Sequence, residues 1–207
     1  MKLSSQSFRD GQAIPLQFAV ASIGGITRTQ PSRNLNPHLA WSDVPARTRS
    51  FAVTVIDFDA PATGEDVNRE YREIAINAPR GPFTHWVLLD IPLSVRQIPE
   101  GYHSSGFTRG GKPGPDAGNG MRHGVNDYTH WFATDLDLKG QYYGYDGPCP
   151  PWNDRRVHRY TFTVYALDVE HLDLPDDITW QTFDRASKGH VLASTSIVGL
   201  YTLNPLV

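Results

Sequence analysis

The sequence predicts a mainly β fold made of short strands and long loops. Sixteen prolines and eighteen glycines divide the 207 residues into short segments, because both residue types interrupt regular secondary structure. The segments between them are rich in Val, Ile, Phe, Tyr and Thr, the residues that favour strands. An apolar fraction of 39% is sufficient for a hydrophobic core. We therefore expect one folded domain over residues 1–207.

Four segments are the clearest strands, and they cover residues 50–56, 85–91, 159–167 and 194–202. Residues 14–19 and 38–41 are weaker candidates. The segments 51–56 and 86–91 are apolar on both faces. This pattern predicts two central strands that are covered on both sides, for example by a second sheet.

One helix is expected towards the C-terminal end. Thr179 is a suitable N-cap, and helical spacing follows it at Trp180, Phe183, Ser187 and Val191. A second, single helical turn is expected over residues 169–172.

Two long segments lack a clear strand or helix pattern. Residues 104–126 are rich in Gly and polar residues, and they predict either a mobile surface loop or a lid over a pocket. Residues 128–143 form a second, extended segment, which contains the pair His130-Trp131.

Charge and hydropathy argue against nucleic acid and membrane as partners. The formal net charge is −3 and the isoelectric point is about 6.2. No run of basic residues is present, whereas nucleic-acid-binding and membrane-surface proteins normally carry a strong basic patch. No stretch approaches the 18 apolar residues of a membrane-spanning helix.

Cysteine usage indicates a reducing compartment. The single cysteine, Cys149, excludes an intrachain disulfide. The first ten residues also lack the apolar stretch of a secretory signal. We therefore expect a cytoplasmic location.

Polar residues gather at the ends of the predicted strands. Asp57 and Asp59 follow the strand at 50–56, and His85 begins the next strand. A turn rich in Gly and Pro covers residues 147–151, and His158 precedes the strand at 159–167. Because strand ends can meet at one edge of a sheet, these residues can line a single pocket.

Such a pocket would suit a small zwitterionic head group. On a regular strand, Asp57 and Asp59 share a face within about 7 Å of each other, so they repel unless a cation or a histidine lies between them. A histidine beside a carboxylate holds its proton above its usual pKa of about 6.5. Protonated histidines, a tyrosine and backbone N–H groups would bind a phosphate, and the aspartates would bind an ammonium group. The turn at 147–151 would form a rigid wall.

Other uses of these residues remain open from the sequence alone. The two histidines and two aspartates are acceptable zinc ligands, although no His-x-x-x-His or His-x-His spacing is present. The same cluster can act as acid and base in a hydrolase, and Cys149 is a candidate nucleophile. A structural interaction module with a vestigial pocket is a further alternative. We expect no catalysis, no metal and no cofactor.

Four motifs occur in the order typical of a known family. They are Asp57-x-Asp59-Ala60-Pro61, His85-Trp86, Gly144-Tyr145-x-Gly147-Pro148-x-Pro150-Pro151 and His158-Arg159-Tyr160. Together with residues 36–45 and the turn at 124–127, they resemble the phosphatidylethanolamine-binding protein family over residues 15–203. The resemblance is closest to the bacterial branch of kinase-inhibitor-like or phospholipid-binding proteins.

The resemblance implies a β-sandwich in which a smaller sheet flanks a large central sheet, with short peripheral helices. It also implies non-catalytic binding of phosphate, phosphoethanolamine, acetate or cacodylate in a small anion pocket. By motif match, the ligand-binding residues would be Asp57, Asp59, His85, Gly147, Pro148, His158 and Tyr160. Animal relatives bind kinases, which makes a kinase or protease a candidate partner. Three features depart from the family pattern, namely Phe58 between the aspartates, the long segment 128–143 and the long Gly-rich loop before it.

Overall fold

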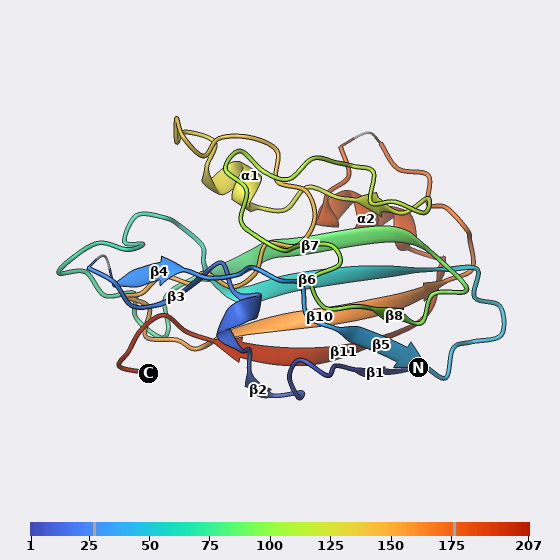
Figure 1. The fold of residues 1–207 in the computed structure, drawn as a ribbon, viewed down its shortest axis with the longest axis horizontal. Helices are drawn as coiled ribbons and strands as arrows, with labels where there is room; N and C mark the ends of the chain where they lie inside the picture. Colours follow the sequence, from blue (N-terminus) through green and yellow to red (C-terminus); the bar gives the residue numbers. More distant parts are fainter. Residues whose placement is uncertain (27, 176) are drawn as a thin grey trace.

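The computed structural model of the chain describes residues 1–26, 28–175 and 177–207. Its main feature is a large sheet of six strands (Figure 1). Across this sheet the strands are β2 (Gln12–Ala13), β11 (Val191–Tyr201), β10 (His158–Leu167), β6 (Ser50–Pro61), β7 (Arg80–Pro92) and β9 (Arg122–His123). Neighbouring strands are antiparallel except β2 and β11, which are parallel.

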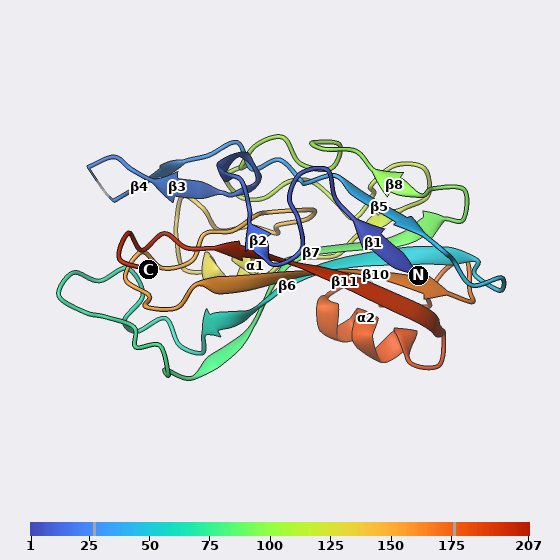
Figure 2. The same ribbon diagram turned by 90° about the horizontal axis from the view of Figure 1, so that it is seen from below.

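A smaller sheet packs over one face of the large sheet. It consists of β1 (Lys2–Ser4), β5 (Leu39–Ser42) and β8 (Gln97–Ile98). Strands β3 (Ala21–Ile23) and β4 (Thr29–Pro31) form a separate two-stranded pair. Figure 2 shows these strands above the large sheet and helix α2 (Trp180–Ser187) below it. The predicted combination of a large sheet with a smaller flanking sheet is confirmed.

The central strands are covered on both faces, as their apolar sequences predict. Phe51 and Val53 of β6 are fully buried in the main core, to which the smaller sheet contributes Leu39 and Trp41. Ala52 of the same strand belongs to a second core, which contains Phe183 of α2. One face of the central strands is therefore covered by the smaller sheet, and the other face is covered by helix α2.

Helix α2 begins where the sequence predicts. Thr179 is its N-cap, and the side chain accepts a hydrogen bond from the backbone N–H of Thr182. The helix ends before Val191, because Gly189 adopts a positive φ of 88° and Val191 already belongs to β11. No helix in the described ranges is long and apolar enough to cross a membrane.

The strand expected at 14–19 is wrong. This segment contains the short 3-10 helix η1 (Leu16–Phe18). Pro15 has a fixed φ and starts a turn, in which the backbone N–H of Phe18 donates to the carbonyl oxygen of Pro15.

The helical turn expected at 169–172 is also wrong, because backbone groups of this segment hydrogen-bond to side chains of the large sheet instead of to each other. The N–H of Leu172 donates to the carboxylate of Asp90, and the hydroxyl of Ser50 donates to the carbonyl oxygen of Val169. The segment consequently lacks helical structure.

Strands β6, β7 and β10 reach one end of the large sheet together. β6 continues to Pro61 and β7 begins at Arg80, so both extend beyond the predicted segments. The register places Asp57 of β6 between Tyr160 of β10 and Phe83 of β7. A β-bulge just after Asp57 interrupts the pairing with β7, as often occurs beside functional sites.

Candidate functional site

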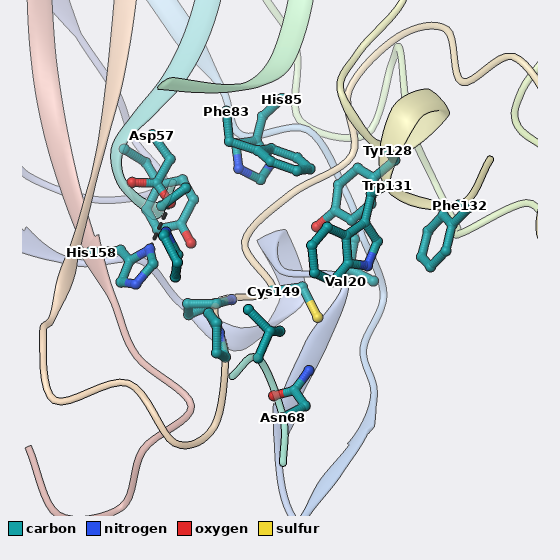
Figure 3. Close-up of a pocket in the computed structure, with 16 residues that line it drawn as sticks. Val20, Asp57, Asn68, Phe83, His85, Tyr128, Trp131, Phe132, Cys149 and His158 are labelled. Atoms are coloured by element: carbon teal, nitrogen blue, oxygen red, sulfur yellow. Dashed lines mark hydrogen bonds and ion pairs between the residues drawn. The ribbon is translucent and has the colours of Figure 1, made fainter. Parts of the chain in front are cut away.

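A cavity of about 220 Å³ lies at this end of the sheet (Figure 3). Its polar lining consists of Asp57, Asn68, His85, Tyr128, His158 and Tyr160. The apolar lining includes Val20, Val67, Phe83, Trp131, Phe132, Cys149, Pro150 and Pro151. Four of the seven sequence-predicted residues, Asp57, His85, His158 and Tyr160, therefore meet at one cavity. Their role in ligand binding stays a prediction.

His158 lies between two carboxylates. Its Nδ1 is 2.6 Å from Asp57 Oδ2, and its Nε2 is 3.1 Å from Asp154 Oδ2. Asp154 is in turn paired with Arg80. Burial disfavours the charged imidazole, but the hydrogen bonds to Asp154 and Asp57 outweigh it and raise the pKa of His158 to about 9. Both ring N–H groups are occupied, so His158 orients Asp57 and has no donor left for an anion.

Asp59 lies next to Asp57 but does not line the cavity. It is fully buried, and its carboxylate accepts hydrogen bonds from Arg159 at 2.7 Å and from Arg156 at 2.8 Å. Burial alone would raise the pKa of Asp59, but these hydrogen bonds hold it at about 2. The predicted repulsion between the two aspartates is relieved, because each carboxylate has its own cationic partners.

His85 presents one free ring nitrogen at the cavity. Its Nδ1 lies 2.7 Å from the carbonyl oxygen of Asp146, and a carbonyl only accepts, so Nδ1 carries a proton. Burial lowers the pKa of His85, although the negative charge of Asp57 opposes the effect. At neutral pH the ring is therefore neutral, and Nε2 is an unprotonated acceptor without a partner in the described part of the chain.

Two donors beside this nitrogen also lack partners among the described residues. The side chain of Tyr160 is 1% exposed, yet its hydroxyl makes no hydrogen bond. The backbone N–H of Cys149, in the cavity wall, makes none either. Cys149 is half-buried and both residues line the cavity, so the two groups can donate to an acceptor that enters it.

Gly147 and Pro148 lie behind the wall and do not line the cavity. The N–H of Gly147 donates to the side chain of Asn34 at 2.8 Å, and its carbonyl oxygen accepts from the hydroxyl of Tyr128 at 2.9 Å. The carbonyl oxygen of Pro148 accepts from the N–H of Val20 at 3.0 Å. These two residues hold the wall in place, as a rigid wall requires.

An aromatic wall closes the other side of the cavity. Tyr128, Trp131 and Phe132 come from the extended segment 128–143, which begins with the short helix α1 (Tyr128–Trp131). Figure 3 shows these three side chains together on one side of the cavity. No residue of the segment 104–126 lines this cavity, so the lid alternative for that segment is not supported.

Several residues of the site lie outside the motifs that the sequence offers. The aromatic run in 128–143 was a usable signal, since aromatic residues are rare in an exposed polar segment. Nothing in the sequence marks Asp154 and Arg80 as residues of the site, because their ion pair joins positions far apart in the chain. The free N–H of Cys149 depends on backbone conformation and is invisible in a sequence.

The site offers little for metal or nucleophilic chemistry. Within the described ranges, no group of three or more His, Cys, Asp or Glu side chains is arranged to hold a metal ion. Burial raises the pKa of the Cys149 thiol to about 11. The thiol consequently stays protonated at neutral pH and is a poor nucleophile.

Comparison with known proteins now decides the family. The family model described as phosphatidylethanolamine-binding protein matches residues 4–202. The chain belongs to the phosphatidylethanolamine-binding protein family. It is 33% identical over 202 residues to the UPF0098 protein YbhB of Escherichia coli, covering 98% of this chain and 100% of YbhB. It is also 31% identical to a UPF0098 protein of Aquifex aeolicus, covering 97% of this chain and 88% of that protein.

Solved structures agree with this assignment. The crystal structure of Escherichia coli YbcL, described as a new member of the mammalian phosphatidylethanolamine-binding protein family, is 25% identical, covers 97% of both chains and gives a TM-score of 0.68. A phosphatidylethanolamine-binding protein homologue from Chlamydia trachomatis is 26% identical, covers 96% of this chain and 95% of its own, and gives a TM-score of 0.61. The predicted family, its bacterial branch, which the comparisons represent by YbhB and YbcL, and the mainly β fold are confirmed.

Proposed function

We propose that this phosphatidylethanolamine-binding protein family member binds small phosphate-bearing head groups, such as phosphoethanolamine, without converting them. The observation that carries the proposal is the set of three unpartnered polar groups at one cavity, namely the Tyr160 hydroxyl, the Cys149 N–H and His85 Nε2. The hydroxyl and the N–H donate to phosphate oxygens, and Nε2 can do so once it carries a proton.

His85 is the group whose protonation would respond to the ligand. As an unprotonated acceptor, Nε2 repels an oxyanion, so a bound phosphate either brings a proton or draws one onto Nε2. The protonated ring then donates from both nitrogens, one to Asp146 and one to the phosphate. Binding is consequently tighter at lower pH.

Asp57 would select for an ammonium group on the same ligand. Its Oδ2 is engaged by His158, and its Oδ1 accepts from the N–H of Asp59 at 2.7 Å. A carboxylate oxygen has a further lone pair for an ammonium donor. A zwitterionic head group therefore fits better than phosphate alone.

The arrangement favours binding over turnover. Both nitrogens of His158 are already bonded to carboxylates, so this ring cannot exchange a proton with a ligand while the network is intact. The protonated Cys149 thiol is not an activated nucleophile.

The proposal also includes a cytoplasmic location and a protein partner. The protein would act in the cytoplasm, as its single cysteine suggests. Ligand binding would accompany modulation of a kinase or protease partner, by analogy with animal relatives.

The test is titration calorimetry of O-phosphoethanolamine with cavity variants. Tyr160→Phe removes one hydrogen bond to a charged group, so we expect about tenfold weaker binding. His85→Ala should weaken binding at least as much. Tyr165→Phe, on the same strand and outside the cavity, is the matched control and should bind like the parent. If His85→Ala binds O-phosphoethanolamine as tightly as the parent protein, the assignment of this cavity is wrong. If the protein converts the ligand, and Asp57→Asn abolishes that conversion, the hydrolase alternative is favoured.

A further inference from the structure

A second cavity, of about 260 Å³, lies beneath the Gly-rich segment 104–126. Its charged and polar lining includes His103, Lys112, Asp116 and His123. Asp146 connects it to the first cavity, because its carboxylate pairs with Lys112 and its carbonyl oxygen accepts from His85. Among the described residues, none lines both cavities.

His123 lines this cavity, and its Nε2 lies near Gly144 in the cavity wall. Its Nδ1 lies 3.3 Å from the indole Nε1 of Trp86, and an indole N–H only donates, so Nδ1 must be an acceptor and the ring proton sits on Nε2. Burial, together with the nearby His103 and Lys112, lowers the pKa of His123 to about 3, so the ring stays neutral. The residue is 7% exposed, and within the described ranges its ring has no hydrogen-bond partner besides the indole of Trp86 and the backbone of Val87.

Lys112 presents its ammonium group beside this donor. A Cβ atom placed on Gly144 would lie 3.6 Å from His123 Nε2 and 3.6 Å from Lys112 Cε, so both side chains border the same space. The Lys112 side chain is 16% exposed and pairs with Asp146. An ammonium group has three N–H donors, so at least one more is available to a ligand.

Asp116, an exposed residue, supplies the opposite charge at the same cavity. Its Oδ1 accepts a hydrogen bond from the backbone N–H of Gly118 at 2.9 Å, which fixes the carboxylate at the loop. Asp116 and Lys112 line the same cavity, but no ion pair within 4.0 Å joins them in the described part of the chain. Two opposite charges that face one space without touching are complementary to a molecule that carries both.

We propose that this second cavity binds a small zwitterion of the α-amino acid class. Its carboxylate accepts hydrogen bonds from Lys112 and His123 Nε2–H, and its ammonium group pairs with Asp116. A lone anion fits less well, because Asp146 and Asp116 together outweigh the single charge of Lys112. A metal ion fits less well too, because coordination at His123 Nε2 would turn Nδ1 into a donor facing the indole N–H of Trp86.

The test uses two indole N–H signals in proton–nitrogen correlation spectra. Trp86 reports on the second cavity through His123, and Trp131 reports on the first, whose wall it forms. Trp86→Phe and Trp131→Phe identify the two signals. We expect glycine to shift the Trp86 signal saturably, and acetate or methylammonium to need about tenfold more ligand, because each lacks one charge contact.

Variants separate the two charge contacts. Asp116→Asn keeps the oxygen that accepts from Gly118, so the loop is preserved, and glycine binding should weaken about tenfold. Lys112→Met should weaken binding of both glycine and acetate. Asp173→Asn, an exposed carboxylate outside both cavities, is the matched control and should leave glycine binding unchanged.

Three results would overturn the proposal. The Trp86 signal could stay in place at glycine concentrations up to about 100 mM, which corresponds to negligible affinity. Glycine could shift only the Trp131 signal, which would place it in the first cavity. Asp116→Asn could bind glycine like the parent. None of these results bears on phosphoethanolamine binding at His85 and Tyr160.

Discussion

His158 shows how a single residue couples the cavity to the stability of the fold. Its ring is held between the carboxylates of Asp57 and Asp154. The pKa of about 9 in the folded protein exceeds the usual 6.5, so the folded state binds this proton more tightly than the unfolded state does. The contribution to stability is complete below pH 6.5 and disappears as the pH rises through 9.

Stability should therefore fall as the pH rises from 7 to 8.5. We expect the free energy of unfolding from urea titrations to decrease by up to about 1.4 kcal/mol per pH unit. His158→Asn should abolish this slope, and His171→Asn should retain it because His158 is intact. An unchanged slope in His158→Asn would show that another group is responsible.

At the scale of elements, the cavity wall at 149–151 depends on close packing of the preceding Gly147 against η1. A Cβ atom on Gly147 would overlap the carbonyl oxygen of Phe18 and lie 2.8 Å from the Tyr145 hydroxyl. That hydroxyl donates to the same carbonyl oxygen at 2.7 Å. Gly147 is thus needed for its lack of a side chain, which explains its position behind the wall.

Gly147→Ala should destabilise the protein by about 2 kcal/mol or more, because backbone must move to admit the methyl group. Gly81→Ala is the matched control, since no atom lies within 4 Å of its added Cβ, and it should change stability by less than about 0.5 kcal/mol. Urea unfolding measures both. Equal stability of the two variants would contradict the packing argument.

The sequence predicts helices and strands well where the signal lies within the element itself, as a hydrophobic periodicity or a capping residue. Thr179 marks the start of α2, and the apolar run before Asp57 marks a central strand. The predictions fail where distant partners decide. Leu172 bonds to Asp90 instead of forming a helical turn.

At the scale of the whole molecule, antiparallel pairing explains why scattered motifs form one site. The C-terminal end of β6 and the N-terminal ends of β7 and β10 lie at the same edge of the sheet. The position of these residues at or near strand ends in the sequence therefore predicts convergence of Asp57, His85, His158 and Tyr160. The sequence cannot predict which groups stay unpartnered, because hydrogen bonds from Arg156 and Arg159 to Asp59, and from His158 to Asp154, decide that.

The cavity in this fold is expected to bind phosphate head groups with uptake of a proton at His85. Titration calorimetry of O-phosphoethanolamine at pH 6 and pH 8, with and without a chelator, tests this most directly. We predict tighter binding at pH 6, no effect of the chelator, and loss of the pH dependence in His85→Ala. Binding that needs the chelated metal, or a pH dependence that His85→Ala leaves unchanged, would contradict the account.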